Sequence, residues 1–223
     1  MRLSDTYDVP ESVASGPHSP AFAKFLRNWF GDTTALTHGE LDITFLNDLT
    51  SEELSLAREL IRRNLKLKYT HIVEGAAALH DPDAVPIMHE LLDNEPDMDR
   101  QLTIAGALWK INRDPVFIET LRKVRAARPS LFQYFHAFKV LWLDDERALD
   151  FLIGLLDVKD AMVQFTALKI LNELELGRRM PGVFARDMPH QPADYNRQRN
   201  DPAFRTRMVE AIHRRNREGK NGI

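Results

Sequence analysis

The chain has 223 residues, of which 43% are hydrophobic and 28% are charged, proportions that suit a protein folding around its own hydrophobic core. It contains no cysteine, which excludes disulfides, thiolate nucleophiles and cysteine-based zinc sites. No apolar run is long enough to cross a membrane, and the polar, acidic residues after Met1 do not resemble a signal peptide. We therefore expect a cytoplasmic protein that does not bind membranes.

The net charge of −3 is unevenly distributed. Residues 1–60 hold 4 basic and 10 acidic side chains, residues 61–176 hold 15 and 18, and residues 177–223 hold 11 and 5. Such a charge gradient could steer a charged partner toward the protein, or its two ends could attract each other. Solvated surfaces and intramolecular compensation are the simpler interpretation.

The N-terminal region combines an irregular arm with one short helix. Residues 1–20 are rich in proline and show little apolar periodicity, which predicts an extended or loosely ordered arm. Residues 21–30 carry aromatic and aliphatic side chains at helical spacing and are followed by Gly31, which predicts an amphipathic helix. We expect its aromatic stripe to cover the open apolar end of the helices that follow.

From Thr50 to Leu176 the chain repeats one pattern about four times: a helix, a tight turn, a second helix and a short joint. The first helix begins with a capping box, in which the Thr50 hydroxyl and the Glu53 carboxylate bond each other's backbone amides. A two-helix repeat of this length is typical of an α-solenoid. The expected helix pairs cover residues 50–66 and 69–80, 83–93 and 98–112, 116–127 and 130–143, and 145–156 and 161–176.

Two spacings support this register. The motif Leu91-Leu92-Asp93 recurs 64 positions later as Leu155-Leu156-Asp157, and Gly75-Ala76 recurs 31 positions later as Gly106-Ala107. Small residues at such positions let neighbouring helices approach closely.

After the repeats, Gly177 is placed to end the last helix, and residues 177–200 form a long irregular segment. Asp201 as N-cap and Pro202 as first residue predict a final helix to about Arg217. Its expected buried stripe is Phe204, Met208, Ala211 and Ile212. The sequence thus divides into an arm with a capping helix (1–49), a repeat domain (50–176) and a C-terminal irregular segment with a basic helix (177–223).

The repeats resemble the HEAT-like family, particularly its short bacterial members. The resemblance covers about residues 50–176, and the second helix of the third pair departs from it because it is rich in aromatic residues. It implies an all-α, right-handed α-solenoid of about four helix pairs, with second helices lining the concave face. The features that carry it are the joints Asp81-Pro82, Asp114-Pro115 and Asp144-Asp145, and the second-helix segments 75–79, 105–108 and 167–171.

The resemblance also implies a binding face. Aromatic and arginine side chains on a concave surface give a protein-binding face large contact area and directional hydrogen bonds. Trp109 and Trp142 could instead be core residues, and Lys110 is a further candidate on the second pair. The predicted partner-binding residues are His71, Glu74, Arg100, Trp109, Gln133, His136, Lys139, Trp142, Gln164 and Lys169.

We therefore expect a non-enzymatic protein-binding module, either an inhibitor or immunity protein or an assembly factor, with no cofactor and no metal. The acidic N-terminal region would suit a basic toxin such as a nuclease. The single His89-Glu90 dipeptide argues against a di-iron site, which needs several such pairs. His71 and Glu74 share one helix face, but two ligands do not make a metal site.

The alternative is a HEAT-like enzyme acting on modified DNA, of the alkylpurine glycosylase type. That resemblance implies a basic concave channel, aromatic residues near the base and a catalytic aspartate, for which Trp109, Trp142 and Asp114 or Asp144 would be candidates. The acidic repeat region disfavours a duplex ligand, because phosphate contacts dominate such affinity. Both aspartates are better explained as helix caps. For the basic C-terminal helix we expect docking against the protein's own repeats or an acidic protein.

Overall fold

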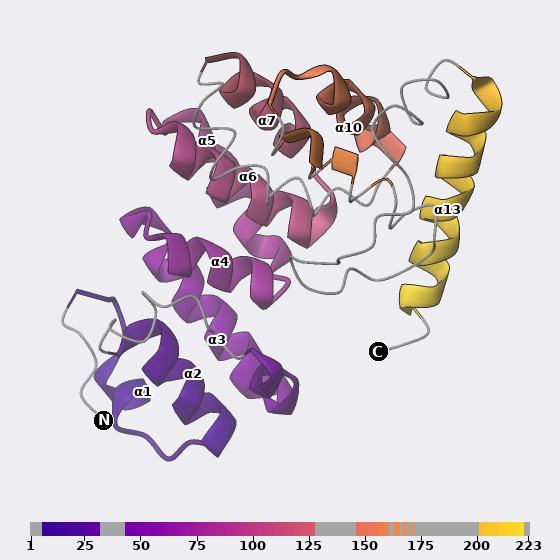
Figure 1. Ribbon diagram of the computed structural model, residues 1–223. Coiled ribbons are helices and arrows are strands. Elements are labelled where there is room, and N and C mark those ends of the chain that lie inside the picture. Colours follow the sequence, from indigo (N-terminus) through magenta and orange to yellow (C-terminus); the bar gives the residue numbers. More distant parts are fainter. Residues whose placement is uncertain are drawn as a thin grey trace. The chain divides into compact units, whose positions relative to one another are not determined.

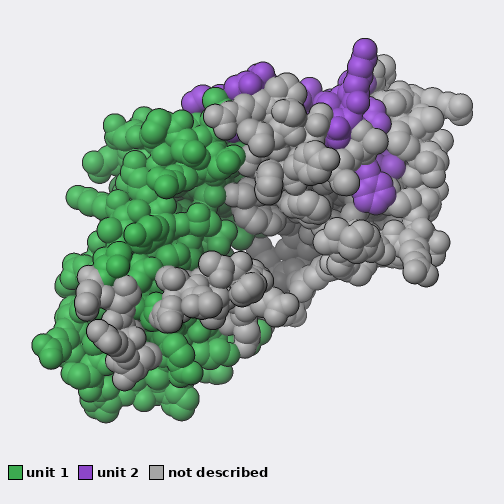
Figure 2. Space-filling view, turned by 60° about the vertical axis from the view of Figure 1, so that its left-hand side comes forward, with its two compact units in different colours: residues 1–120 green, residues 121–223 purple. Residues whose placement is uncertain are grey.

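A computed structural model describes residues 6–31, 43–127, 146–160, 163–165, 167, 168, 171 and 201–220. Over these residues every regular element is a helix and none is a strand, which confirms the all-α prediction. None of the described helices is long and apolar enough to cross a membrane. The chain separates into two compact units, residues 1–120 and 121–223 (Figure 2), and each is described by itself.

The first unit begins with α1 (Glu11–Ala14) and α2 (Pro20–Phe30) (Figure 1). The Ser19 hydroxyl caps α2 by accepting a hydrogen bond of 3.1 Å from the Phe22 amide, and α2 ends at Gly31. The predicted helix over 21–30 is confirmed. Its stripe faces inward, because Phe22, Phe25, Leu26, Trp29 and Phe30 are all buried.

The first helix pair consists of α3 (Ser51–Asn64) and α4 (Thr70–Ala78). The capping box is present as predicted: Thr50 Oγ1 accepts from the Glu53 amide at 3.2 Å, and the Glu53 carboxylate accepts from the Thr50 amide at 3.1 Å. Between the helices lies the 3-10 turn η3 (Leu65–Leu67), which closes with Lys68 in the left-handed region.

The second pair is α5 (Val85–Asp93) and α6 (Met98–Asn112), and it is followed by α7 (Val116–Ala127). The Asp97 carboxylate caps α6 through the Asp99 and Arg100 amides, at 2.9 and 3.0 Å. α4 packs most extensively against α6, and α3 packs against α4 and α5 against α6. α4 therefore contacts both its own partner, α3, and the next second helix of the described chain, α6.

The joint between the two pairs is closed by side chains of α3. Asp81 is fully buried and accepts a hydrogen bond of 2.8 Å from Arg62. It also caps η4 (Pro82–Ala84) through the Asp83 amide. Arg58 donates to the Leu79 carbonyl at 2.8 and 3.0 Å, so that a cation meets the C-terminal end of α4, where the helix dipole favours positive charge. The Asp81-Pro82 joint noted in the sequence thus contains a buried aspartate that pairs with an arginine of α3.

A close approach at Gly75 fixes α2 against this pair. The Trp29 indole N–H donates to the His71 carbonyl at 3.1 Å, and a methyl group on Gly75 would collide with Trp29 and lie 2.8 Å from Ile61 Cδ1. The small residue predicted to allow close packing therefore has that function. The side chains that it admits closely are Trp29 of α2 and Ile61 of α3.

The described elements of the second unit are η6 (Glu146–Ala148), α10 (Leu149–Gly154), η7 (Leu155–Asp157) and α13 (Pro202–Lys220). The helix predicted over 145–156 is therefore divided by 3-10 turns at both ends. The predicted helix 130–143 lies outside the described residues, as does most of 161–176 and the irregular segment 177–200.

The terminal helix α13 confirms its predicted cap and stripe. The Asp201 carboxylate accepts from the Ala203 amide at 2.9 Å. Arg205 pairs with Asp150 and His213 lies 3.6 Å from Glu146, so that the basic helix contacts the unit's own acidic side chains. Among the described side chains of α13, the buried ones are the four predicted, Phe204, Met208, Ala211 and Ile212.

Candidate functional site

The first unit carries a surface cavity of about 480 Å³ over α4 and α6. Its volume lies in the range of sites that hold a small molecule or a few side chains of a partner. The apolar part comes from α2, from the residue before η2 (Thr44–Asp48) and from the end of α4, and the polar part comes from α4 and the end of α6. The lining residues are Trp29, Ile43, His71, Glu74, Ala77, Ala78, His80, Lys110 and Arg113.

Helical spacing explains which residues of α4 and α6 meet at the cavity. His71, Glu74 and Ala78 follow one another at intervals of three and four residues, which places them on one face of α4. Lys110 and Arg113 are likewise three residues apart at the end of α6. Because α4 and α6 pack against each other, these two faces form adjoining walls.

The charged groups of the cavity influence one another. Desolvation by the surrounding protein lowers the pKa of Lys110, and the negative charge of Glu74 acts in the opposite direction. Lys110 is nevertheless exposed as a whole residue. Arg113 adopts the left-handed conformation that ends α6, with φ 60°, and its guanidinium lies 5.6 Å from the centre of the Trp109 ring. The described lining of the cavity thus includes a lysine, an arginine and the carboxylate of Glu74.

His71 connects the cavity to the N-terminal segment. Its Nε2 lies 3.0 Å from the Tyr7 hydroxyl, and its ring stacks on the exposed ring of Tyr69 at an interplanar angle of 13°. Burial lowers the pKa of His71, which favours the neutral ring. Burial also raises the pKa of the Tyr7 phenol, and Tyr69 adds to this effect. The pair is therefore a neutral hydrogen bond at neutral pH.

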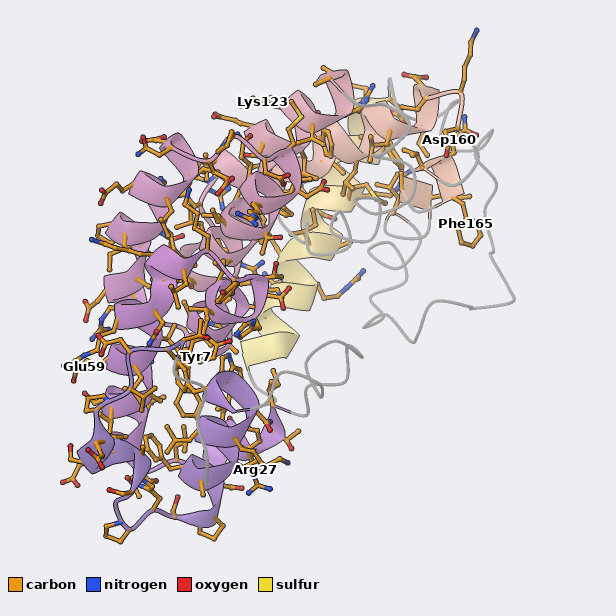
Figure 3. The ribbon with its side chains drawn as sticks, turned by 90° about the vertical axis from the view of Figure 1, so that its left-hand side faces the viewer. Tyr7, Arg27, Glu59, Lys123, Asp160 and Phe165 are labelled. Carbon is orange, nitrogen blue, oxygen red and sulfur yellow. The ribbon has the colours of Figure 1, made fainter. Side chains whose placement is uncertain are left out.

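Residues 6–10 form a strap that α3 holds by its last residue (Tyr7 is labelled in Figure 3). The buried Asn64 amide accepts from the Asp8 backbone N–H at 2.8 Å and donates to the Asp8 carbonyl at 3.1 Å. The Tyr7 ring packs edge-on against Phe30, Tyr69 and His71. The arm predicted to be loosely ordered over 1–20 is thus bound to the first helix pair from the strap onward.

The structure places the predicted partner-binding residues in different environments. His71 and Glu74 meet in the cavity, together with Lys110. Arg100 is exposed at the opposite end of α6, ten residues from Lys110 and therefore about 15 Å away along the helix. Gln164 bonds the Leu156 carbonyl at 3.0 Å. The predicted residues Gln133, His136, Lys139, Trp142 and Lys169 lie outside the described residues.

Trp109 differs from its predicted position on the concave face. It is fully buried and lies beside Phe117, with ring centres 6.1 Å apart. The reason is that α6 is packed on several sides: the buried run from Ile104 to Trp109 is continuous. The neighbouring Lys110 is rotated by about 100° on the helix and so reaches the cavity.

Sequence reasoning did not include six of the lining residues, namely Trp29, Ile43, Ala77, Ala78, His80 and Arg113. His80 and Arg113 stand directly before the aspartates of two joints. Both residues follow the helical residues of α4 and α6 and have positive φ values, of 45° and 60°. The Asp-Pro joints after them were therefore the sequence signal that could have identified these two residues. Trp29 and Ile43 come from outside the predicted repeat region, and no local pattern relates them to α4.

The residues His89 and Asp114, which the sequence offered for metal binding or catalysis, bond each other at a helix joint. His89 Nε2 lies 2.8 Å from Asp114 Oδ2, and Asp114 Oδ1 accepts from the Val116 amide at 3.0 Å. Asp114 is therefore the cap of α7. Among the residues that the structure describes, no group of three or more His, Asp or Glu side chains could hold a metal ion.

Comparisons of this chain with protein-family models, with curated proteins and with solved structures found no match.

Proposed function

We propose that this protein is a non-enzymatic binding module, a right-handed α-solenoid of about four HEAT-like helix pairs that binds a protein partner through its second helices. The stacking of α4 on α6 supports the solenoid. A contact between successive turns supports it as well: Lys68, between α3 and α4, lies 3.2 Å from the buried carboxylate of Glu95, between α5 and α6. Equivalent turns of neighbouring pairs are adjacent in a solenoid.

The observation that carries the binding function is the cavity on α4 and α6. It lies on the second helices, and it brings two of the predicted partner-binding residues, His71 and Glu74, together with Lys110. Its walls combine apolar surface with convergent polar groups, which is the usual composition of a recognition site. An inhibitor or immunity protein, or an assembly factor, would use such a face to cover a complementary surface.

The DNA-modifying alternative draws no support from the described residues. Two of its candidate residues, Trp142 and Asp144, lie outside the described residues, and the other two are Trp109, near the base, and Asp114, as the catalytic aspartate. Trp109 is fully buried, and the Asp114 carboxylate is occupied by His89 and the Val116 amide. Neither Trp109 nor Asp114 is placed to meet a base.

The decisive experiment fills the cavity without changing its charge. Ala78→Trp places a large side chain in the wall, and Ala126→Trp adds the same side chain at an exposed position of α7. Each tagged full-length chain is used to capture partners from the native cells, and the captured proteins are quantified by mass spectrometry. We expect one stoichiometric partner with wild type and Ala126→Trp, reduced at least tenfold with Ala78→Trp.

Circular dichroism and thermal unfolding verify that both variants are folded. Equal capture by a folded Ala78→Trp chain would show that the cavity is not the binding face. Recovery of nucleic acid in place of a protein would favour the enzyme alternative. The effect of this chain on the activity of the captured partner then separates an inhibitor from an assembly factor.

A further inference from the structure

The strap, residues 6–10, is held in the way that a bound peptide is held. Its main chain bends in a tight turn, because the Val9 N–H donates to the Tyr7 carbonyl at 3.0 Å. At the centre of this turn, Asp8 bonds the Asn64 side chain with both its backbone N–H and its carbonyl, at 2.8 and 3.1 Å. The Asp8 side chain itself is exposed. The contact with Asn64 therefore recognises the main chain and not the identity of the side chain.

The surroundings of Asn64 orient it for this contact. Asn64 is 1% exposed, and its amide nitrogen also donates to the Leu60 carbonyl of α3 at 2.8 Å. That bond fixes the side chain with its oxygen and its remaining N–H directed at the strap. A buried amide group that loses its partners is strongly unfavourable. The strap site therefore requires an occupant that offers a main-chain N–H and a carbonyl at this point.

The strap also places one aromatic side chain in a pocket. The Tyr7 ring meets three other rings edge-on, those of Phe30, Tyr69 and His71, with ring centres 5.4, 6.1 and 5.9 Å away. This geometry is favourable between aromatic rings. The Tyr7 hydroxyl lies 3.0 Å from His71 Nε2. The pocket thus suits a tyrosine, because it gives the ring apolar walls and the hydroxyl a hydrogen-bond partner.

The chain that follows Tyr7 adds little to the hold on the strap. Residues 8–20 are all described, and none of them is buried. The chain is fixed again at Ser19, whose backbone N–H donates to the Glu53 carboxylate at 3.1 Å and whose hydroxyl caps α2. A segment with few buried contacts opens at a low free energy while the core stays folded. The strap can therefore leave its site while α2 and α3 keep their packing.

The strap site adjoins the cavity on α4 and α6. His71 belongs to both, because its Nε2 meets the Tyr7 hydroxyl and its side of α4 lines the cavity. A partner seated on the cavity thus reaches the strap site without a break. The tether gives the strap an effective concentration on the order of millimolar, so a displacing segment needs more contacts than the strap has. A partner that also occupied the cavity would have them.

We propose that the protein partner displaces the strap and enters the strap site with a tyrosine at the start of a tight turn. The partner's tyrosine takes the place of Tyr7 against His71, and the residue after it offers its main chain to Asn64. This inference rests on the proposed function and deepens it. The strap is then a tethered competitor for the partner, and the partner is characterised by a tyrosine-led turn.

The test measures binding of a fluorescent peptide of residues 4–12, Ser-Asp-Thr-Tyr-Asp-Val-Pro-Glu-Ser, to full-length chains by fluorescence polarisation. Tyr7→Ala in the chain removes the ring that holds the strap and leaves the pocket to the peptide. We expect saturable binding to Tyr7→Ala that is at least about tenfold tighter than to wild type, because the tethered competitor is weakened. Tyr7→Phe keeps the ring and loses the contact with His71, and should tighten binding by about fivefold.

Modified peptides show which atoms the site recognises. N-methylation of the peptide at Asp8 removes the donor to Asn64 and should weaken binding at least about tenfold. The matched control is Asp8→Asn in the peptide, which should bind like the unmodified peptide because this side chain is exposed. Circular dichroism verifies that the variant chains are folded. Absence of saturable binding to folded Tyr7→Ala and Tyr7→Phe chains, or equal binding of the N-methylated peptide, would overturn the proposal.

Capture from the native cells connects the strap site with the partner and separates this inference from the proposed function. Tyr7→Ala should capture more of the stoichiometric partner than wild type, and an excess of the unmodified peptide should reduce capture. If Ala78→Trp abolishes capture while Tyr7→Ala and the peptide leave it unchanged, the cavity is the binding face and displacement of the strap is wrong. If the peptide competes while Ala78→Trp has no effect, the partner uses the strap site and not the cavity.

Discussion

At the residue scale, Gly75 shows how one missing side chain positions the wall of the cavity. A Cβ added there would collide with Trp29 and lie 2.8 Å from Ile61 Cδ1, so there is no room for a methyl group. Gly75→Ala should therefore reduce the free energy of unfolding by about 1–3 kcal/mol, the usual cost of overpacking a core. Urea unfolding of the two proteins measures this difference.

The matched control for this prediction is Gly154→Ala at the end of α10. A methyl group there would meet no atom within 4 Å, and the residue already has helical angles, φ −63° and ψ −20°. This variant should be unchanged or up to about 1 kcal/mol more stable, because alanine restricts the unfolded chain. Similar losses in both variants would show that the contact with Trp29 is not the cause.

His71 should make the stability of the first unit depend on pH. Its pKa in the folded protein lies below its ordinary value of 6.5, so below pH 6.5 the unfolded chain binds the proton more readily than the folded one. Its stabilising contribution is complete above pH 6.5 and is lost as the pH falls toward the folded-state pKa. His71→Gln should remove this loss.

Urea unfolding at pH 7.5, 6.5 and 5.5 checks the effect, with the stability of wild type falling more steeply than that of His71→Gln. His213→Gln serves as control, since His213 is 53% exposed on α13 in the second unit. Parallel pH profiles for wild type and His71→Gln would contradict the assignment of the effect to this half-buried ring.

At the element scale, the joint between the two helix pairs depends on an ion pair between α3 and the turn after α4. Asp81 is fully buried, and Arg62 is its cationic partner at 2.8 Å. Arg62→Ala would leave a buried carboxylate without its counter-charge and should cost about 3 kcal/mol of unfolding free energy. The measurement is again urea unfolding.

Arg63→Ala is the control on the neighbouring position of α3. Arg63 pairs with Glu59 one turn earlier, and both side chains are exposed, at 41% and 48%; Glu59 is labelled on α3 in Figure 3. Its loss should cost about 0.3–0.5 kcal/mol, as for other exposed pairs on one helix. A cost for Arg62→Ala as small as this would show that Asp81 is satisfied without the guanidinium.

At the scale of the whole molecule, sequence patterns predicted where the helices begin and end more accurately than they predicted the contacts between distant residues. The ends of α2, α3, α7 and α13 agree with the predicted caps to within a few residues. The strap and the buried ion pairs were not predicted. Tyr7 and His71 are 64 positions apart, and no pattern within one helix relates them.

The sequence by itself determined that the described chain folds into short capped helices, because a cap is a contact between residues three or four positions apart. It also selected His71, Glu74 and Lys110 as surface groups of second helices. Only the tertiary structure decided that these three share a cavity, that Trp109 is core and that Asp81 is buried. Those outcomes depend on how helices distant in sequence pack together, and this packing is set by the summed burial of many side chains rather than by any local motif.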